Sequence, residues 1–214
     1  MFARFAAAVA AMVVVVTASN ILVQYPVVAD LGPIHLGDIL TWGAVTYPFA
    51  FLVSDLTNRH DGPQRARLVV LIGFVVALGI SFFLATPRIA IASGSAFLLG
   101  QLLDIAVFQR LRNRYWLIPP LSASLFGSLI DTAIFFSLAF APMFGFIDLA
   151  FGMEDGSLGF GAPWLGIGSE VPLWLSLATG DFAVKFLAAL LLLAPYRVLM
   201  GKLMPFPAKP ATAG

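Results

Sequence analysis

Apolar residues are grouped in six long runs along this chain, and short segments with charged residues, glycine or proline separate the runs. A transmembrane helix needs roughly 20 mostly apolar residues, because inside lipid a segment must satisfy its own backbone hydrogen bonds. The pattern therefore predicts six membrane-spanning helices. They are expected at about Phe5–Val23, Ile39–Leu56, Leu68–Ala85, Ile89–Phe108, Trp116–Phe144 and Pro172–Leu193.

Composition supports the same class of protein. The 214 residues are 60% hydrophobic and 11% charged, and the mean hydropathy is +0.97. Soluble domains are about 45–50% apolar and about 25% charged, so a soluble fold could not bury this much apolar surface. We predict an all-α integral membrane protein with one six-helix transmembrane domain over residues 1–200. Residues 201–214, rich in proline and alanine, are predicted to form a disordered cytoplasmic tail.

Several chemistries have little support in the composition. The chain has no cysteine, which excludes disulfides and thiolate metal sites, and its two histidines give a poor basis for a metal centre. The net charge of +1 gives no argument for nucleic-acid binding. We therefore expect no metal, no cofactor and no nucleic-acid partner.

The first apolar run resembles a signal peptide, because Arg4 precedes it and Val16-Thr17-Ala18 looks cleavable. The run continues to Val23, however, and we interpret it as a retained helix. Lys and Arg stay on the cytoplasmic side of a membrane, and with an inner N-terminus ten of them lie in inner segments while Arg88 alone lies in an outer loop. This bias predicts that both termini are cytoplasmic. The outer loop 145–171 is expected to be solvated and partly folded over the outer mouth.

Four ionisable residues lie inside predicted helices. Each costs about 2.5–3.5 kcal/mol on insertion, whereas a Leu or Ile contributes only about −0.3 to −0.6 kcal/mol. Intramembrane charges usually face a cavity and mark a site or a pathway. The four are Asp104, Asp131, Asp181 and Lys185. Asp181 and Lys185 are four residues apart, so a purely structural ion pair is an alternative interpretation.

Polar and aromatic residues accompany these carboxylates at helical spacing. Gln101 shares a helix face with Asp104, and Phe97 and Phe108 lie one turn to either side. Ser124, Ser128 and Asp131 form a stripe that continues to Phe135, although such serines also serve as helix-packing contacts. The pattern predicts a shared polar pocket with aromatic walls. Such a pocket suits a flat polar heterocycle, because a carboxylate accepts hydrogen bonds from adjacent N–H groups while aromatic faces stack on the ring.

Enzyme alternatives are weaker. The stretch Asp61–Arg67 resembles the signature of the CDP-alcohol phosphotransferases, but its spacing is one residue too long and the second acidic pair is missing. Too few oxygen ligands would remain for divalent ions. Neither His35 nor His60 lies where a base for an intramembrane serine protease is needed, and there is no P-loop motif. We interpret the chain as a non-enzyme.

Four stretches taken together resemble the queuosine precursor transporter family of bacterial inner-membrane proteins. They are YPFAFLVSDLTNRHDGPQRAR, GQLLDIAVFQRLR, SASLFGSLIDTAIFFSLAF and DFAVKFLAALLLLAPYRVL. In order and spacing they cover the second to sixth predicted helices. Ser128 stands where many members of that family carry Gln.

The resemblance implies a six-helix inner-membrane importer for 7-cyano-7-deazaguanine, 7-aminomethyl-7-deazaguanine or both. Another small polar or vitamin-like solute is the alternative. The matching residues are Asp55, Thr57, Gln101, Asp104, Asp131, Thr132, Asp181 and Lys185. Gln101, Asp104 and Asp131 are expected to bind the polar edge of the deazaguanine base. Asp181 and Lys185 are expected as a pocket or gating pair, and Asp55 and Thr57 as gating residues or as caps of the following turn. Small residues such as Ala7 and Ala11, or Gly73 and Ala77, are expected to allow close helix packing or a homodimer.

Overall fold

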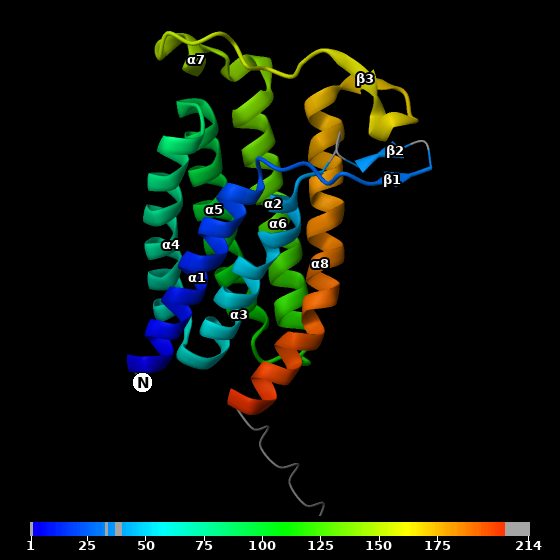
Figure 1. Ribbon diagram of the computed structural model, residues 1–214. Helices are drawn as coiled ribbons and strands as arrows, with labels where there is room; N and C mark the ends of the chain where they lie inside the picture. The colour runs from blue at the N-terminus through cyan, green and yellow to red at the C-terminus, as the bar shows by residue number, and fades with distance from the viewer. Residues whose placement is uncertain (1, 33, 37–39, 204–214) are drawn as a thin grey trace, which may run out of the picture.

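The computed structural model describes residues 2–32, 34–36 and 40–203, and within them the chain is an all-α bundle (Figure 1). Five of the helices in these described residues are long and apolar enough to cross a bilayer. These are α1 (Phe2–Leu22), α4 (Pro63–Leu84), α5 (Pro87–Leu111), α6 (Ile118–Phe140) and α8 (Leu173–Leu203). The chain is therefore a multi-pass membrane protein. Part of the predicted tail, residues 204–214, lies outside the described residues.

The predicted second span, Ile39–Leu56, is not one continuous helix. It consists of α2 (Trp42–Thr46) and α3 (Pro48–Asp61), with Tyr47 between them. Pro48 lacks the backbone N–H that would continue the helical hydrogen bonds, so one of them is missing there, although Tyr47 keeps helical φ and ψ of −56° and −38° and donates to the carbonyl oxygen of Gly43. The polar end of α3 also makes it less apolar than a typical span. The count of six spans therefore rests on treating α2 and α3 as one broken helix.

The other helix boundaries differ from the prediction mainly at the ends. Helix α6 ends at Phe140, and the short 3-10 helix η2 (Pro142–Phe144) follows it, so the predicted run to Phe144 is too long. Helix α8 continues ten residues past the predicted end at Leu193, through Pro195. Between α3 and α4, Gly62 has a φ of 88°, a left-handed conformation that glycine adopts without steric cost.

One end of the bundle carries the connections between α3 and α4 and between α5 and α6. The beginning of α1 and the end of α8 also lie at this end, the lower one in Figure 1. The opposite end carries α7 (Phe146–Ala150), η3 (Trp164–Gly166) and an antiparallel pair of strands, β3 (Gly161–Pro163) and β4 (Glu170–Pro172). A second short hairpin, β1 (Asp30–Leu31) with β2 (Ile34–His35), follows α1. The sequence pattern did not predict these hairpins.

Small residues allow the helices to approach closely at the centre of the bundle. A Cβ atom on Gly100 of α5 would lie 2.9 Å from Asp131 Cβ and 3.0 Å from the carbonyl oxygen of Gly127 on α6. Gly73 of α4 similarly faces Met12 of α1, where an added Cβ would lie 2.7 Å from Met12 Cγ. Part of the expected small-residue packing is therefore used within one chain. The expected homodimer remains a prediction.

Candidate functional site

Tyr47, at the junction of α2 and α3, places its side chain in the centre of the bundle. Tyr47 Oη donates a hydrogen bond of 2.7 Å to Asp131 Oδ1 on α6. The Tyr47 ring packs edge-on against Phe51 and Phe97, at centroid distances of 5.9 and 6.1 Å.

Lys185 of α8 is the centre of an ion network with α6. Its Nζ donates to Asp131 Oδ2 at 2.6 Å, to Asp181 Oδ2 at 2.5 Å and to Thr132 Oγ1 at 3.3 Å. Thr132 in turn donates to Asp181 Oδ2 at 2.7 Å, and the ammonium lies 5.0 Å from the centroid of the Tyr47 ring. Two carboxylates thus share one ammonium. We call Tyr47, Asp131, Thr132, Asp181 and Lys185 the charge network.

A cavity of about 420 Å³ ends on this charge network. It extends from the loop residues Gln24 and Thr41 down to Asp131, Asp181 and Lys185. Phe135, Phe136 and Phe140 form an aromatic wall in which the rings of Phe135 and Phe136 meet edge to face at 5.1 Å. Small-molecule pockets are usually about 300–1,000 Å³, mostly apolar, and carry a few polar groups that fix the ligand. This cavity has those features.

A second buried group of carboxylates lies nearer the opposite end. Asp55 of α3 and Asp104 of α5 have exposed fractions of 2% and 0%, and their carboxyl groups lie within hydrogen-bonding reach of each other. Ser54 Oγ lies 3.3 Å from Asp104 Oδ2, and Ser124 reaches Asp55. We call Asp55 and Asp104 the carboxyl pair.

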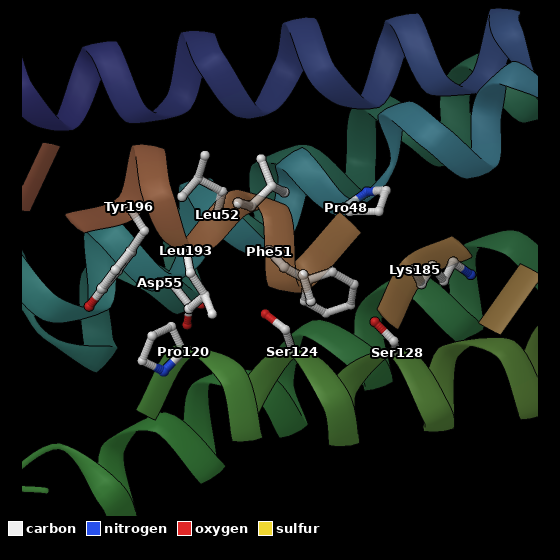
Figure 2. A pocket seen from close by; sticks show the side chains of 12 residues that line it. Pro48, Phe51, Leu52, Asp55, Pro120, Ser124, Ser128, Lys185, Leu193 and Tyr196 are labelled. Atoms are coloured by element: carbon white, nitrogen blue, oxygen red, sulfur yellow. The ribbon is translucent and has the colours of Figure 1, made fainter. Parts of the chain in front are cut away.

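A small cavity of about 20 Å³, room for roughly one water molecule, lies between these two groups. Asp55 and Tyr196 line one end of it, and Lys185 lines both this cavity and the large one. Figure 2 shows Ser124 and Ser128 of α6 pointing into the small cavity between Asp55 and Lys185. The charge network therefore separates the large cavity from the small one.

The structure brings together only part of the predicted site. Asp131, Phe135, Asp181 and Lys185 line the large cavity, Thr132 joins their hydrogen bonds, and Ser128 lines the small cavity. Gln101 and Asp104 are completely buried and line neither cavity. Gln101 has no hydrogen-bond partner for either amide atom among the described residues.

The remaining predicted residues lie in packed regions. Phe97 belongs to the core around Met12 and Val69, and Phe108 packs with Ala123, Tyr196 and Met200. Thr57 donates to the backbone carbonyl of Val53 at 2.7 Å. Neither Thr57 nor Asp55 caps α4, whose N-cap is Gly62 with no side-chain hydrogen bond. The capping alternative is therefore wrong for both residues.

Sequence reasoning missed two residues of this arrangement. Tyr47 begins the stretch YPFAFLVSDLTNRHDGPQRAR, and the feature that could have identified it is Pro48, which follows it within an apolar segment. The second residue is Arg88, which the sequence presented as a lone outer cation but which is only 1% exposed. It donates to Asp148 Oδ2 at 2.8 Å and to Asp155 Oδ1 at 3.0 Å. It also donates to the carbonyl oxygens of Leu138 and Ala141, at 2.8 and 2.6 Å.

Arg88 thereby fixes the connection between α6 and α8 over one end of the bundle. Asp155 also accepts hydrogen bonds from the Oγ and the backbone N–H of Ser157. These Ser157 contacts, together with the Arg88 guanidinium, lower the pKa of Asp155. A buried cation, Arg88, therefore holds part of the acidic loop, which the sequence predicted to be solvated and partly folded over one end of the bundle. We call residues 142–157 the cap.

Comparison with known families gives one match that covers most of the chain. The family model described as "Putative vitamin uptake transporter" matches residues 41–85 and 80–200. The match begins at the broken helix and ends near the end of α8, so it includes the charge network and the carboxyl pair. No solved structure matches the chain.

Curated relatives include three bacterial proteins. The chain is 40% identical over 147 residues to the "Queuosine precursor transporter" of Escherichia coli, which covers 59% of this chain and 64% of that protein. It is 37% identical over 153 residues to the "Probable queuosine precursor transporter" of Haemophilus influenzae, covering 59% of this chain and 65% of that protein. A Bacillus subtilis protein of the same description is 24% identical over 194 residues, covering 77% and 73%. The chain thus spans just under two thirds of the length of the first two relatives.

Proposed function

We propose, because this chain belongs to the vitamin uptake transporter family, that it imports a queuosine precursor of the 7-deazaguanine class across the bacterial inner membrane. The observation that carries the proposal is the large cavity, which ends on two carboxylates and an ammonium and has a wall of phenylalanines. Its volume and its mixture of apolar and polar groups suit a flat bicyclic base.

The charge network offers the right groups for a guanine-type edge. Such an edge carries adjacent N–H donors beside a carbonyl oxygen. A carboxylate of Asp131 or Asp181 would accept from the N–H groups, and Lys185 would donate to the carbonyl oxygen. Asp181 has the more accessible carboxylate, since its side chain is 14% exposed against 5% for Asp131. We therefore expect Asp181 to meet the ligand first.

The aromatic wall would hold the plane of the base. Stacking of a base on an aromatic side chain contributes about 1–3 kcal/mol. Phe135, Phe136 and Phe140 lie on α6 next to the carboxylates, so one ligand would reach both. Phe97 and Phe108, which the sequence suggested for this role, are packed elsewhere, and we do not propose them as stacking residues.

Tyr47 would connect ligand binding to opening of the opposite side. Its hydrogen bond to Asp131 joins the broken helix to α6 between the large and the small cavity. A ligand that donates to Asp131 and accepts from Lys185 would compete with this contact and release α2 and α3. Alternating access in many transporters uses such movements around a fixed central site.

Direct binding to the purified protein in lipid nanodiscs tests the proposal. We expect 7-cyano-7-deazaguanine and 7-aminomethyl-7-deazaguanine to bind, and adenine, whose edge lacks the guanine pattern, to bind much more weakly. Asp131→Asn should weaken binding of both precursors by about tenfold or more, because a hydrogen bond to a charged group contributes about 1.5–3 kcal/mol. Tight binding of an unrelated vitamin, with no binding of either precursor, would favour the alternative solute.

A further inference from the structure

The carboxyl pair has no role in the ligand site described above, yet it is costly to bury. Neither Asp55 nor Asp104 interacts with a cationic side chain among the described residues. Each carboxyl group contacts the other one and a serine hydroxyl. Two carboxylates in contact cannot both remain ionised in a buried site without a compensating positive charge. A proton held between them resolves this conflict.

Several buried polar atoms of α3 and α5 also lack partners. Oδ1 of Asp55, Oδ1 of Asn58, Oε1 of Gln101 and Oδ1 of Asp104 are buried acceptors with no hydrogen-bond partner among the described residues, and the donor Nε2 of Gln101 is likewise unpartnered. Unsatisfied buried acceptors each carry a desolvation cost of about 1–3 kcal/mol. Oδ1 of Asp55 and Oδ1 of Asp104 therefore each lack a donor, and a proton shared by the two carboxyl groups would supply one. A proton needs only two oxygens, and this pair supplies them.

A route for that proton is present beside the pair. Asp55 lies at the end of the small cavity, with Ser124 and Ser128 between it and Lys185 (Figure 2). The cavity has room for roughly one water molecule, and hydroxyls with a water can relay a proton over this path.

The charged and titratable groups around the pair leave it uncompensated. Tyr196 of α8 lines the same end of the small cavity, and α6 contributes only the neutral Ser124. Arg59 of α3 and Arg112, which follows α5, act on Tyr196 at this end, but each donates to the other's backbone carbonyl, at 2.7 and 2.8 Å. Lys185, at the other end of the cavity, is paired with Asp131 and Asp181.

From these contacts we infer that Asp55 and Asp104 form a proton-binding site that couples import of the ligand to the proton gradient. The inference rests on the proposed function, since it supplies the energy source for that import. Protonation of the pair permits α3 and α5 to pack as they do here. Loss of the proton leaves two like charges in contact and disfavours this packing at the end opposite the large cavity, whereas the protonated, ligand-loaded protein exposes the ligand to either side.

Reconstituted full-length protein in liposomes tests the inference. An imposed pH gradient, acid outside, should drive accumulation of 7-cyano-7-deazaguanine, whereas a sodium gradient at equal pH should not. Asp55→Asn and Asp104→Asn conserve volume and remove the titrating group. Both variants should lose accumulation but keep counterflow exchange of labelled for unlabelled ligand, because exchange needs no net proton movement. Asp61→Asn, at the end of α3 and bonded to Arg65, is the matched control and should behave like the wild type.

The outcomes separate the two proposals. Absence of counterflow in the wild type would contradict the transport proposal itself. Counterflow without a response to the pH gradient, a response to sodium instead, or loss of counterflow in both Asn variants would overturn the proton site. A measurement without ligand is independent of transport. Infrared spectra of the reconstituted protein at neutral pH should contain the carbonyl band of a protonated carboxylic acid that Asp104→Asn removes and Asp61→Asn does not. If Asp104→Asn leaves that band unchanged, the pair does not hold the proton.

Discussion

Removal of the ammonium from the charge network is the most informative single substitution. Lys185→Met keeps nearly the same length and apolar stem but removes the positive charge. Asp131 Oδ2 and Asp181 Oδ2, which lie 2.6 and 2.5 Å from Nζ, would then face each other across the former ammonium position. Tyr47 and Thr132 would keep one hydrogen bond each to these carboxylates. The two negative charges would have no counter-charge in the network.

The expected cost follows from the burial of the partners. Breaking a buried ion pair by removing one member costs about 3–5 kcal/mol, because the remaining charge is left uncompensated. Asp181 is 14% exposed and can be partly rehydrated through the large cavity, so we expect the lower limit, about 3 kcal/mol. For a chain of this size, about 1 kcal/mol corresponds to about 2–4 °C in Tm, which gives a decrease of about 6–12 °C.

Thermal unfolding of the purified protein, followed by tryptophan fluorescence, measures this decrease. Arg114→Met removes an exposed positive charge and is the control, with little expected change. The double variant Lys185→Met/Asp131→Asn should recover a large part of the loss, because it removes the uncompensated charge as well. A Tm for Lys185→Met equal to that of Arg114→Met, or a double variant that adds the two single losses, would refute the ion network as a buried, coupled unit.

Three further predictions address the packing and the cap. Gly100→Ala should destabilise the protein by about 1–3 kcal/mol and impair ligand binding, because the added Cβ would lie 2.9 Å from Asp131 Cβ. The control, Gly79→Ala on α4, has no atom within 4 Å of the added Cβ and should be neutral or stabilising. Equal changes in Tm for the two variants would contradict the close approach of α5 and α6. Arg88→Met should leave Asp148 buried without its cation and should speed amide hydrogen exchange across the cap, whereas exchange at wild-type rates would show that Arg88 does not order it. The pKa of Asp155 is lowered in the folded protein, so its contribution to the stability of the cap is present above the unfolded value of about 3.9 and is lost as pH falls through the lower folded value. Amide hydrogen exchange in the cap, relative to the intrinsic rate at each pH, should therefore accelerate below about pH 4. An identical pH profile in Asp155→Asn would contradict this assignment.

The helical class of the fold could be predicted because apolar run length directly reflects bilayer thickness. The broken helix could not be placed in the same way. The run Ile39–Leu56 has the right length for a span, and only Pro48 signals that the backbone is interrupted. The end of α8 was missed because a proline there does not end the helix. Pro195 near a basic segment resembles a helix end, yet the helix continues through it.

The candidate site was partly predictable because ionisable residues inside apolar runs need partners. This reasoning identified Asp131, Asp181 and Lys185, which the structure joins directly. It also grouped Gln101 and Asp104 with Asp131, because all three lie on neighbouring helices. Gly100, the neighbour of Gln101, packs against Asp131, so Gln101 and Asp131 lie at similar depth, yet Gln101 and Asp104 line neither cavity. Sequence spacing does not report which face of α5 borders a cavity.

The expected aromatic walls show a similar limit. Helical periodicity identifies residues that share a face with a carboxylate, but it does not distinguish a cavity wall from a packed core. Phe135 lines the cavity, whereas Phe97 and Phe108 belong to core clusters. Tyr47 and Arg88 were missed because each acts through tertiary contacts. Tyr47 bonds a residue 84 positions away, and the partners of Arg88 lie at least 50 positions away.

The central claim is that the charge network at the end of the large cavity binds a deazaguanine for import. Uptake of labelled 7-cyano-7-deazaguanine by cells unable to synthesise it tests this claim directly, with expression of each variant matched to the wild type. The wild-type protein should raise uptake well above that of cells with an empty vector. Asp131→Asn should reduce this gain by about tenfold or more, and Asp61→Asn should retain it. No gain with the wild type, or a full gain with Asp131→Asn, would contradict the account.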